Sequence, residues 1–167
     1  PTLRPMFNRA TQGAYNPGST FKIVTALAAL EAGLDPNEPV TVEPDPRRPG
    51  KGAIFVGRRK VEDTAPPGEY TFKDAFKHSS NAYFIRAGLR AGRERLLAMG
   101  KRFHLGESLG LGTRQEVVGE FPGPEDVVGV WNDGNLANAS IGQEITVTPL
   151  QMAVLTAAVV NGGRLYY

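Results

Sequence analysis

The chain has 167 residues, 41% of them hydrophobic, and this length and composition predict one compact domain with a core of its own. Nineteen basic and seventeen acidic residues leave a net charge of +2, and the arginines are scattered rather than striped with aromatic residues, so composition does not support nucleic-acid binding. The absence of cysteine excludes disulfides, thiolate metal sites and cysteine nucleophiles, and two histidines are too few for a histidine-built metal site.

Helical patterns predict most of the regular structure. Residues 20–32 are apolar on nearly every side, as expected of a buried central helix, and Gly33 follows where a left-handed C-terminal residue would sit. The last helix is the best signalled, with Thr148 as N-cap, Pro149 at the first helical position and Gln151 completing a capping box. Between them the pattern predicts one short helical turn, a helix over about 81–90 and another over 93–103.

Two regions are predicted to be non-helical. Residues 35–50 contain five prolines, which cannot continue a helix and indicate an extended surface connection. A short β-hairpin turning at Gly57 is predicted next, so residues 35–70 form a Pro- and Gly-rich insertion within the domain. Residues 106–138, where glycine and proline recur, are predicted to be loops with little regular structure.

The stretch YNPGSTFKIV places a serine and a lysine three residues apart at the start of the first helix. Residues three apart share a helix face, so the ammonium of Lys22 can fold back beside the hydroxyl of Ser19. Burial among apolar neighbours would disfavour the charged form of Lys22 and make it a usable base. The helix N-terminus would also aim a backbone amide at the serine side, as half of an oxyanion hole. The same pair is compatible with an ordinary helix cap and a lysine placed there by chance.

Two other readings of the sequence have less support. Residues 13–20 nearly match a phosphate-binding loop, but Ser19 occupies the position of its lysine and no apolar strand precedes it. His78 invites a Ser-His pair with Ser19, but no acidic partner is fixed and the G-x-S-x-G turn is absent. We therefore interpret His78 as a partly buried structural histidine.

A second motif, Ser79-x-Asn81, follows Ser19 by about sixty residues, and the segment IGQEITVTPLQMAVLTAAVVNGG lies about sixty residues later still. Taken alone, Ser79 or Ser80 would be an ordinary N-cap. Taken in order, NRATQGAYNPGSTFKIVTALAALEAG, HSSNAYF and the third segment resemble the transpeptidase domain of a high-molecular-mass penicillin-binding protein. The likeness is strongest to class B enzymes of the penicillin-binding protein 2 type, and it covers nearly the whole of residues 1–167.

The resemblance implies a fold and a reaction. The fold would be mainly α with a small β-hairpin, as the helical portion of an α/β serine β-lactamase and D,D-transpeptidase domain with most of its central sheet outside the chain. Ser19 would attack the carbonyl between the terminal D-alanines of a peptidoglycan stem peptide, and Lys22 would take its proton. Ser79 would relay the proton to the leaving amine, and Asn81 would hold Lys22 and the substrate amide. No cofactor or metal is implied.

The resemblance also implies partners and a location. The partners would be peptidoglycan stem peptides, β-lactam antibiotics that acylate Ser19, and other proteins of cell-wall synthesis, on the extracytoplasmic side of a membrane reached through an anchor outside this chain. The chain begins with Pro1 and lacks the K-[ST]-G strand of the family, so we expect a fragment that is inactive or nearly so alone. Two alternatives remain open: a D,D-carboxypeptidase or β-lactamase-like hydrolase with the same motifs, and a non-catalytic helical interaction module.

Overall fold

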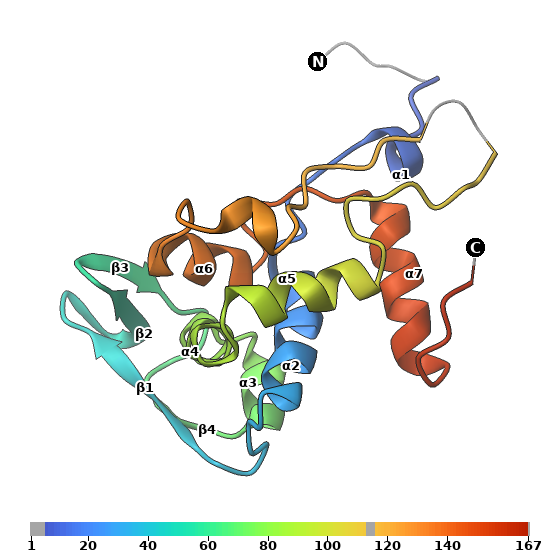
Figure 1. The fold of residues 1–167 in the computed structure, drawn as a ribbon. Coiled ribbons are helices and arrows are strands. Elements are labelled where there is room, and N and C mark those ends of the chain that lie inside the picture. Colours follow the sequence, from blue (N-terminus) through green and yellow to red (C-terminus); the bar gives the residue numbers. More distant parts are fainter. Residues whose placement is uncertain (1–5, 113–115, 167) are drawn as a thin grey trace.

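A computed structural model describes residues 6–112 and 116–166, with helices forming most of the molecule and a small sheet at one side (Figure 1). The helices, of which η1 and η2 are 3₁₀ helices, are α1 (Arg9–Gln12), η1 (Gly18–Phe21), α2 (Lys22–Glu31), α3 (Phe72–His78), α4 (Asn81–Ala91), α5 (Arg93–Arg102), η2 (Glu125–Val127), α6 (Asp133–Ser140) and α7 (Pro149–Val160). The strands are β1 (Val40–Asp45), β2 (Arg48–Val56), β3 (Arg59–Glu62) and β4 (Gly68–Tyr70).

The core forms where α2 and α4 meet, with α5 and α6 packed against them. Small side chains make the close approach possible: a Cβ added at Gly88 of α4 would lie 1.9 Å from Ser140 Oγ of α6. The buried Thr25 of α2 donates its hydroxyl proton to the Ser140 carbonyl at 2.8 Å, so α2 and α6 are also joined by a hydrogen bond. The predicted central helix is confirmed as a buried element, although its first turn is the 3₁₀ helix η1.

The sheet lies within the predicted insertion of residues 35–70 and has the order β3-β2-β1-β4, with all neighbours antiparallel. The predicted hairpin is confirmed, because β2 and β3 pair around Gly57, which has a φ of 58°. The extended connection predicted for residues 35–50 is wrong in part, because β1 pairs there with both β2 and β4. Strand β1 contains Pro44, which lies beside a shift in the register of the β1–β2 pair. This irregularity explains why the sequence of β1 shows no regular strand pattern.

The loops predicted for residues 106–138 are also wrong in part, because α6 begins at Asp133. Asn132 caps this helix by accepting hydrogen bonds from the N–H groups of Gly134 and Asn135, and the Asn135 side chain completes a capping box. The capping box predicted for α7 is confirmed. The helices predicted over 81–90 and 93–103 are confirmed as α4 and α5.

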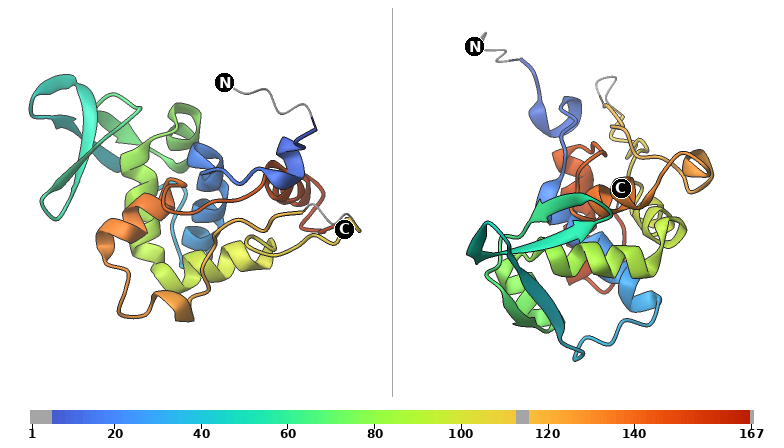
Figure 2. Two further views of the ribbon diagram at one scale, coloured as in Figure 1. Left: turned by 90° about the horizontal axis from the view of Figure 1, so that it is seen from above. Right: turned by 90° about the vertical axis from the view of Figure 1, so that its left-hand side faces the viewer.

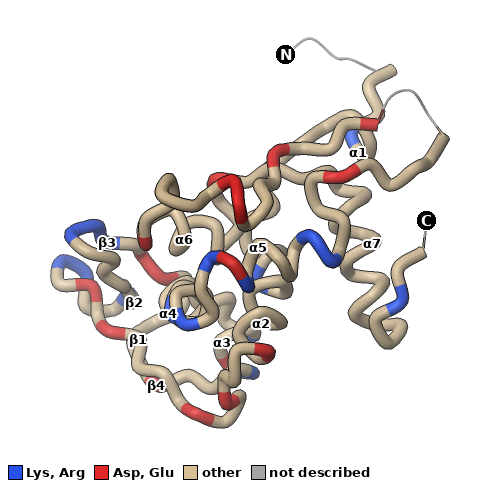
Figure 3. Tube along the Cα trace, in the orientation of Figure 1, with Lys and Arg blue, Asp and Glu red and all other residues tan. Residues whose placement is uncertain are grey.

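The sheet and α1 lie at opposite ends of the molecule, and α1 contacts α7 (Figure 2). Lys and Arg residues gather at the turns of the small sheet, near the ends of β2 and β3 (Figure 3). Across the described residues, no helix combines the length and apolar character needed to cross a bilayer.

Candidate functional site

The turn that carries Ser19 is held by a distant part of the chain. Tyr15 and Val147 exchange two backbone hydrogen bonds of 2.9 Å, and the Gly18 N–H donates to the Gly142 carbonyl at 3.0 Å. Gly142 has a φ of 74°, and a Cβ added there would lie 2.2 Å from the Gly18 oxygen. The segment that follows α6 therefore packs directly against the turn before Ser19.

Ser19 is exposed on η1, and its hydroxyl does not cap the helix. The N-cap position is Pro17, which makes no side-chain cap hydrogen bond. The Ser19 oxygen instead accepts a hydrogen bond from Ser79 Oγ at 3.0 Å. The interpretation of Ser19 as an ordinary helix cap is therefore wrong, and its hydroxyl is available at the surface.

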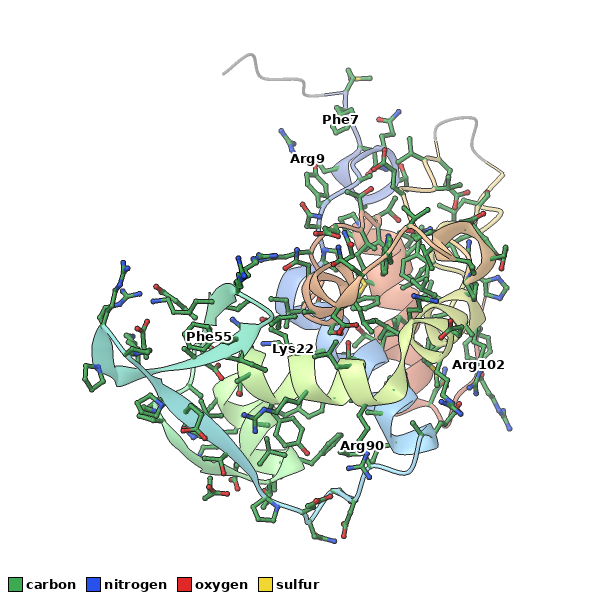
Figure 4. All side chains as sticks on the ribbon, turned by 60° about the vertical axis from the view of Figure 1, so that its left-hand side comes forward. Phe7, Arg9, Lys22, Phe55, Arg90 and Arg102 are labelled. Carbon is green, nitrogen blue, oxygen red and sulfur yellow. The ribbon has the colours of Figure 1, made fainter. Side chains whose placement is uncertain are left out.

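Lys22 is the first residue of α2, and only 1% of it is exposed. Its ammonium donates to the Ser79 carbonyl at 2.6 Å, to Ser79 Oγ at 3.1 Å and to Asn81 Oδ1 at 2.8 Å. It also lies 5.6 Å from the centre of the Phe84 ring, which favours a positive charge. Figure 4 shows Lys22 deep in the molecule, between the sheet and the helices.

Burial lowers the pKa of Lys22 from 10.5 to about 8, and the negative charge of Asp63 opposes that shift. Desolvation disfavours the ammonium more than the neutral amine, so the larger effect is the loss of water around Nζ. At neutral pH about one Lys22 side chain in ten is then uncharged. A lysine in this state can accept a proton without help from a metal or a histidine.

Ser79 connects the lysine to the exposed serine. The sequence predicts that Lys22 lies directly beside Ser19, whereas the described hydrogen bonds run from Lys22 to Ser79 and from Ser79 to Ser19. Ser79 ends α3 in the left-handed conformation, with a φ of 52° and a ψ of 41°. Such a conformation costs an L-residue roughly 1–2 kcal/mol. The structure thus brings all four predicted site residues together, and the described hydrogen bond to the Ser19 hydroxyl comes from Ser79 rather than from the Lys22 ammonium.

Asp63 is a buried residue of this cluster that sequence reasoning missed. Its carboxylate accepts hydrogen bonds from Ser80 Oγ at 2.7 Å, Asn81 N at 2.7 Å, Ala82 N at 2.9 Å and Ala65 N at 3.1 Å. It is one of seventeen acidic residues, and no local spacing distinguishes it from the others. Asp63 is identified by its hydrogen bonds to Ser80, Asn81 and Ala82, which lie 17 to 19 residues later in the chain. These hydrogen bonds are visible only in the structure.

Thr64 adds a second unpredicted contact. Its hydroxyl donates to the Ser79 carbonyl, the same oxygen that accepts from Lys22, and lies 3.2 Å from the His78 carbonyl. The His78 side chain is exposed and packs edge-on against Tyr70, with ring centres 5.5 Å apart. The interpretation of His78 as a partly buried residue is therefore wrong.

Among residues 6–112 and 116–166, no group of three or more His, Cys, Asp or Glu side chains is arranged to hold a metal ion. The chemistry available to the cluster comes from two hydroxyls, an amine and an amide. An exposed hydroxyl linked by hydrogen bonds to a buried amine of lowered pKa is the arrangement of an activated nucleophile.

Comparison with known proteins assigns the chain to a family. Residues 2–167 match the model of the penicillin-binding protein transpeptidase domain, so the chain belongs to that family. Peptidoglycan D,D-transpeptidase PbpA of Mycobacterium tuberculosis is 34% identical over 163 residues, which cover 95% of this chain and 31% of PbpA. The resemblance found in the sequence is thereby confirmed.

Solved structures agree with this assignment. The ceftriaxone acyl-enzyme complex of penicillin-binding protein A from M. tuberculosis matches with a TM-score of 0.80 and 31% identity, over 96% of this chain and 36% of that one. Penicillin-binding protein 2 of Helicobacter pylori, solved in complex with MreC, matches with a TM-score of 0.81 and 27% identity, over 95% of this chain and 30% of that one. The chain thus spans between 30% and 36% of the length of these relatives.

Proposed function

We propose that this chain is the part of a peptidoglycan D,D-transpeptidase domain that carries the nucleophile and its base. The observation that carries the proposal is the line of hydrogen bonds from exposed Ser19 through Ser79 to buried Lys22. The name of PbpA and the acyl-enzyme state of penicillin-binding protein A support the same chemistry. Ser19 is the nucleophile, Lys22 the base, Ser79 the relay and Asn81 the residue that orients Lys22.

The first step is proton transfer away from Ser19. With Lys22 protonated, the amine donates to Ser79 Oγ and Ser79 donates to Ser19 Oγ. When Lys22 is neutral, its lone pair can accept from Ser79, and Ser79 can accept from Ser19, so both hydrogen bonds reverse. The Ser19 proton then moves along this line as the oxygen attacks the carbonyl carbon of the penultimate D-alanine.

Collapse of the tetrahedral intermediate forms the acyl-enzyme. The C–N bond breaks, the amine of the terminal D-alanine takes a proton from Lys22 by way of Ser79, and an ester to Ser19 remains. An amine of a second stem peptide then attacks the ester, so that a new amide forms while the Ser19 oxygen regains its proton. A β-lactam follows the first half of this sequence, with its ring C–N bond in place of the peptide bond.

Two further groups support the reaction. Asn81 accepts from Lys22 through Oδ1, and its Nδ2 donates to the Glu62 carbonyl at 3.0 Å, so the amide that orients the base is held from both ends. The N–H of Ser19 lies in the first turn of η1, where helix N–H groups lack partners within the helix, and in this proposal it donates to the developing oxyanion. Removal of one such donor typically lowers a rate by about 10² to 10³.

The remainder of the proposal concerns the whole protein. In this proposal the chain supplies the helical portion of the α/β transpeptidase domain; residues 1–167 contain no K-[ST]-G triplet, the motif whose strand would supply the second oxyanion amide. The working substrates are stem peptides ending in D-Ala-D-Ala, β-lactams are inhibitors, and the domain acts on the extracytoplasmic side of the membrane. The H. pylori complex with MreC supports a partner among cell-wall proteins.

Fluorescent penicillin tests this proposal on the full-length gene product. We expect stoichiometric labelling that peptide mapping assigns to Ser19, and little labelling of residues 1–167 alone. Labelling at another residue, or none in the full-length product, contradicts the proposal and favours the non-catalytic module. Incubation with a pentapeptide ending in D-Ala-D-Ala, with and without an acceptor amine, then separates transpeptidase from carboxypeptidase, because only the former makes the cross-linked amide.

A further inference from the structure

We propose that Asp63 is the positioning residue of this site, which fixes Ser79 and Asn81 around Lys22 by binding the start of α4. The inference rests on the proposed function, because it concerns the same cluster. Asp63 touches neither Ser19 nor Lys22 through a described hydrogen bond, so its action is indirect. Four observations support the proposal: the hydrogen bonds that Asp63 accepts from the start of α4, the contacts that hold Asp63 against the sheet, the hydrogen bond from Thr64 to Ser79, and the charged groups around the cluster.

Asp63 satisfies the backbone at the start of α4. The N–H groups of Asn81 and Ala82 donate to its two oxygens, and the hydroxyl of Ser80 donates to the second of these. Ser80 in turn accepts from the N–H of Tyr83 at 3.1 Å. The first three N–H groups of the helix are therefore bound by Asp63 and Ser80, where a negative charge is also favoured by the helix dipole. Displacement of Asp63 would release the turn from which the Asn81 side chain projects.

Asp63 is itself held against the sheet. Its N–H donates to the Gly52 carbonyl of β2 at 2.7 Å, and the Gly52 N–H donates to the Ala65 carbonyl at 3.1 Å. A Cβ at Gly52 would lie 2.5 Å from Val42 Cγ1 and 2.6 Å from the Ala65 oxygen. Only glycine therefore fits at this position, where β2 packs against the segment that contains Asp63. The small sheet thereby serves as the fixed support of the cluster.

The segment that contains Asp63 reaches the other side of the cluster through the next residue. Thr64 donates its hydroxyl proton to the Ser79 carbonyl, which also accepts from Lys22. Residues 63 and 64 thus bind the chain on both sides of Ser80. This arrangement holds Ser79 in its left-handed conformation while Asn81 begins a helix.

The charges around the cluster make the role measurable by pH. Asp63 is the charged group that raises the pKa of Lys22 against the effect of burial. Burial and the charges of Asp63 and Asp74 raise the pKa of Tyr70, so this phenol of β4 stays neutral below pH 9. The remaining titratable groups nearby are His78 of α3, which contacts Tyr70, and Glu62 and Lys60 of β3, which pair with Arg48 and Asp45.

Asp63→Asn in the full-length gene product tests the proposal, because it removes the charge and keeps the side-chain volume. The matched control is Asp45→Asn, which changes the other buried aspartate of the described residues, at the end of β1, where the partners are Lys60 and the Arg47 N–H. The rate of acylation by fluorescent penicillin is measured from pH 7 to pH 9. We expect Asp63→Asn to lower the plateau rate at least about tenfold and to move the midpoint of the pH profile to lower pH, with both unchanged in Asp45→Asn.

A second variant separates position from folding. Asp63→Glu keeps the charge but moves the carboxylate by one methylene, so we expect a slower plateau with the midpoint of the wild-type protein. A wild-type rate in either Asp63 variant, or a loss explained entirely by the unfolded fraction, overturns the proposal.

Hydrogen exchange supplies a readout that does not depend on acylation. In Asp63→Asn, and not in Asp45→Asn, amides 81 and 82 should exchange faster, and unchanged exchange there overturns the proposal. If the wild-type protein is not acylated at all, the proposed function fails, while exchange still decides the role of Asp63.

Discussion

The starts of α2 and α4 both carry a serine ahead of an apolar helix, and the two serines behave differently. Ser80 is fully buried, accepts from the Tyr83 N–H and donates to Asp63. Ser19 is exposed, its side chain makes no described cap hydrogen bond, and its hydroxyl accepts from Ser79. The start of α4 is thus hydrogen-bonded inside the protein, whereas the turn before α2 presents Ser19 at the surface.

This difference separates support from chemistry within one site. The hydrogen bonds at the start of α4 fix the position of Asn81, and in the proposed mechanism the exposed Ser19 hydroxyl is the group that reacts. A capped helix start lowers the free energy of the folded state, and an uncapped one gives up that stabilisation. The four predictions below test this division, from the largest expected effect to the smallest.

Lys22→Met should have the largest effect. Methionine keeps the apolar stem and removes the amine, so Ser79 loses the group to which it would pass the Ser19 proton. We expect the acylation rate of the full-length product to fall by about 10² to 10⁴. The control is Lys73→Met, which removes an exposed lysine of α3. An acylation rate within tenfold of wild type in Lys22→Met would remove Lys22 from the mechanism.

The pH dependence of acylation should follow the ionisation of Lys22. Its pKa of about 8 lies below the ordinary value, so the ammonium form, which cannot accept a proton, dominates below pH 8. The acylation rate should therefore rise about tenfold per pH unit below pH 8 and level off above it. Stopped-flow measurement with a chromogenic cephalosporin gives this profile. A rate that is flat between pH 6 and pH 8 would contradict a base at Lys22.

Ser80→Ala and Ser19→Ala should change different properties. Ser80→Ala removes a cap and leaves one Asp63 oxygen short of a donor, so we expect the free energy of unfolding to fall by about 1–2 kcal/mol. Ser19→Ala should change it by less than about 0.5 kcal/mol, because the hydroxyl is exposed, while acylation is lost. Urea unfolding and labelling of the same samples check both. An equal fall in the free energy of unfolding in the two variants would contradict the division between a stabilising Ser80 and a non-stabilising Ser19.

The smallest expected effect is a difference in stability between two variants of Ser79. Ser79→Gly and Ser79→Ala both remove the relay hydroxyl, so both should slow acylation to the same extent. Glycine adopts the left-handed conformation of this residue without cost, so Ser79→Gly should be more stable than Ser79→Ala by roughly 1 kcal/mol. Thermal unfolding of the pair measures the difference. Greater stability of the alanine variant would show that residue 79 leaves the left-handed region when the hydroxyl is absent.

Several helices could be predicted because their signals are local: the Thr148 cap, for example, binds Gln151, three residues later. The four site residues were predicted from the order of their motifs along the chain and from the resemblance that this order carries. The parts that were not predicted depend on tertiary contacts or on residues that break a pattern. Strand β1 contains Pro44, and α6 is preceded by a long segment rich in glycine and proline, so neither shows a regular period.

The four predicted site residues lie together in the structure, but their hydrogen bonds differ from the direct Ser19–Lys22 pairing that the sequence predicts. Sequence spacing places Lys22 beside Ser19, whereas Ser79, which is 57 residues from Lys22, joins them in the structure. Asp63 has no signature at all, since it binds mainly backbone N–H groups, which every residue except proline carries. The sequence motifs mark the four predicted site residues, whereas Asp63 is found only from its contacts in the structure.

The burial of Lys22 has a consequence for covalent chemistry at this site. All three hydrogens of its ammonium are engaged and 1% of the residue is exposed, while the neighbouring Ser19 hydroxyl faces outward. Amine-directed reagents should therefore modify the exposed Lys51, Lys73 and Lys77 long before Lys22. An electrophile that reaches the cluster from the surface should therefore meet the exposed Ser19 before the buried Lys22 amine.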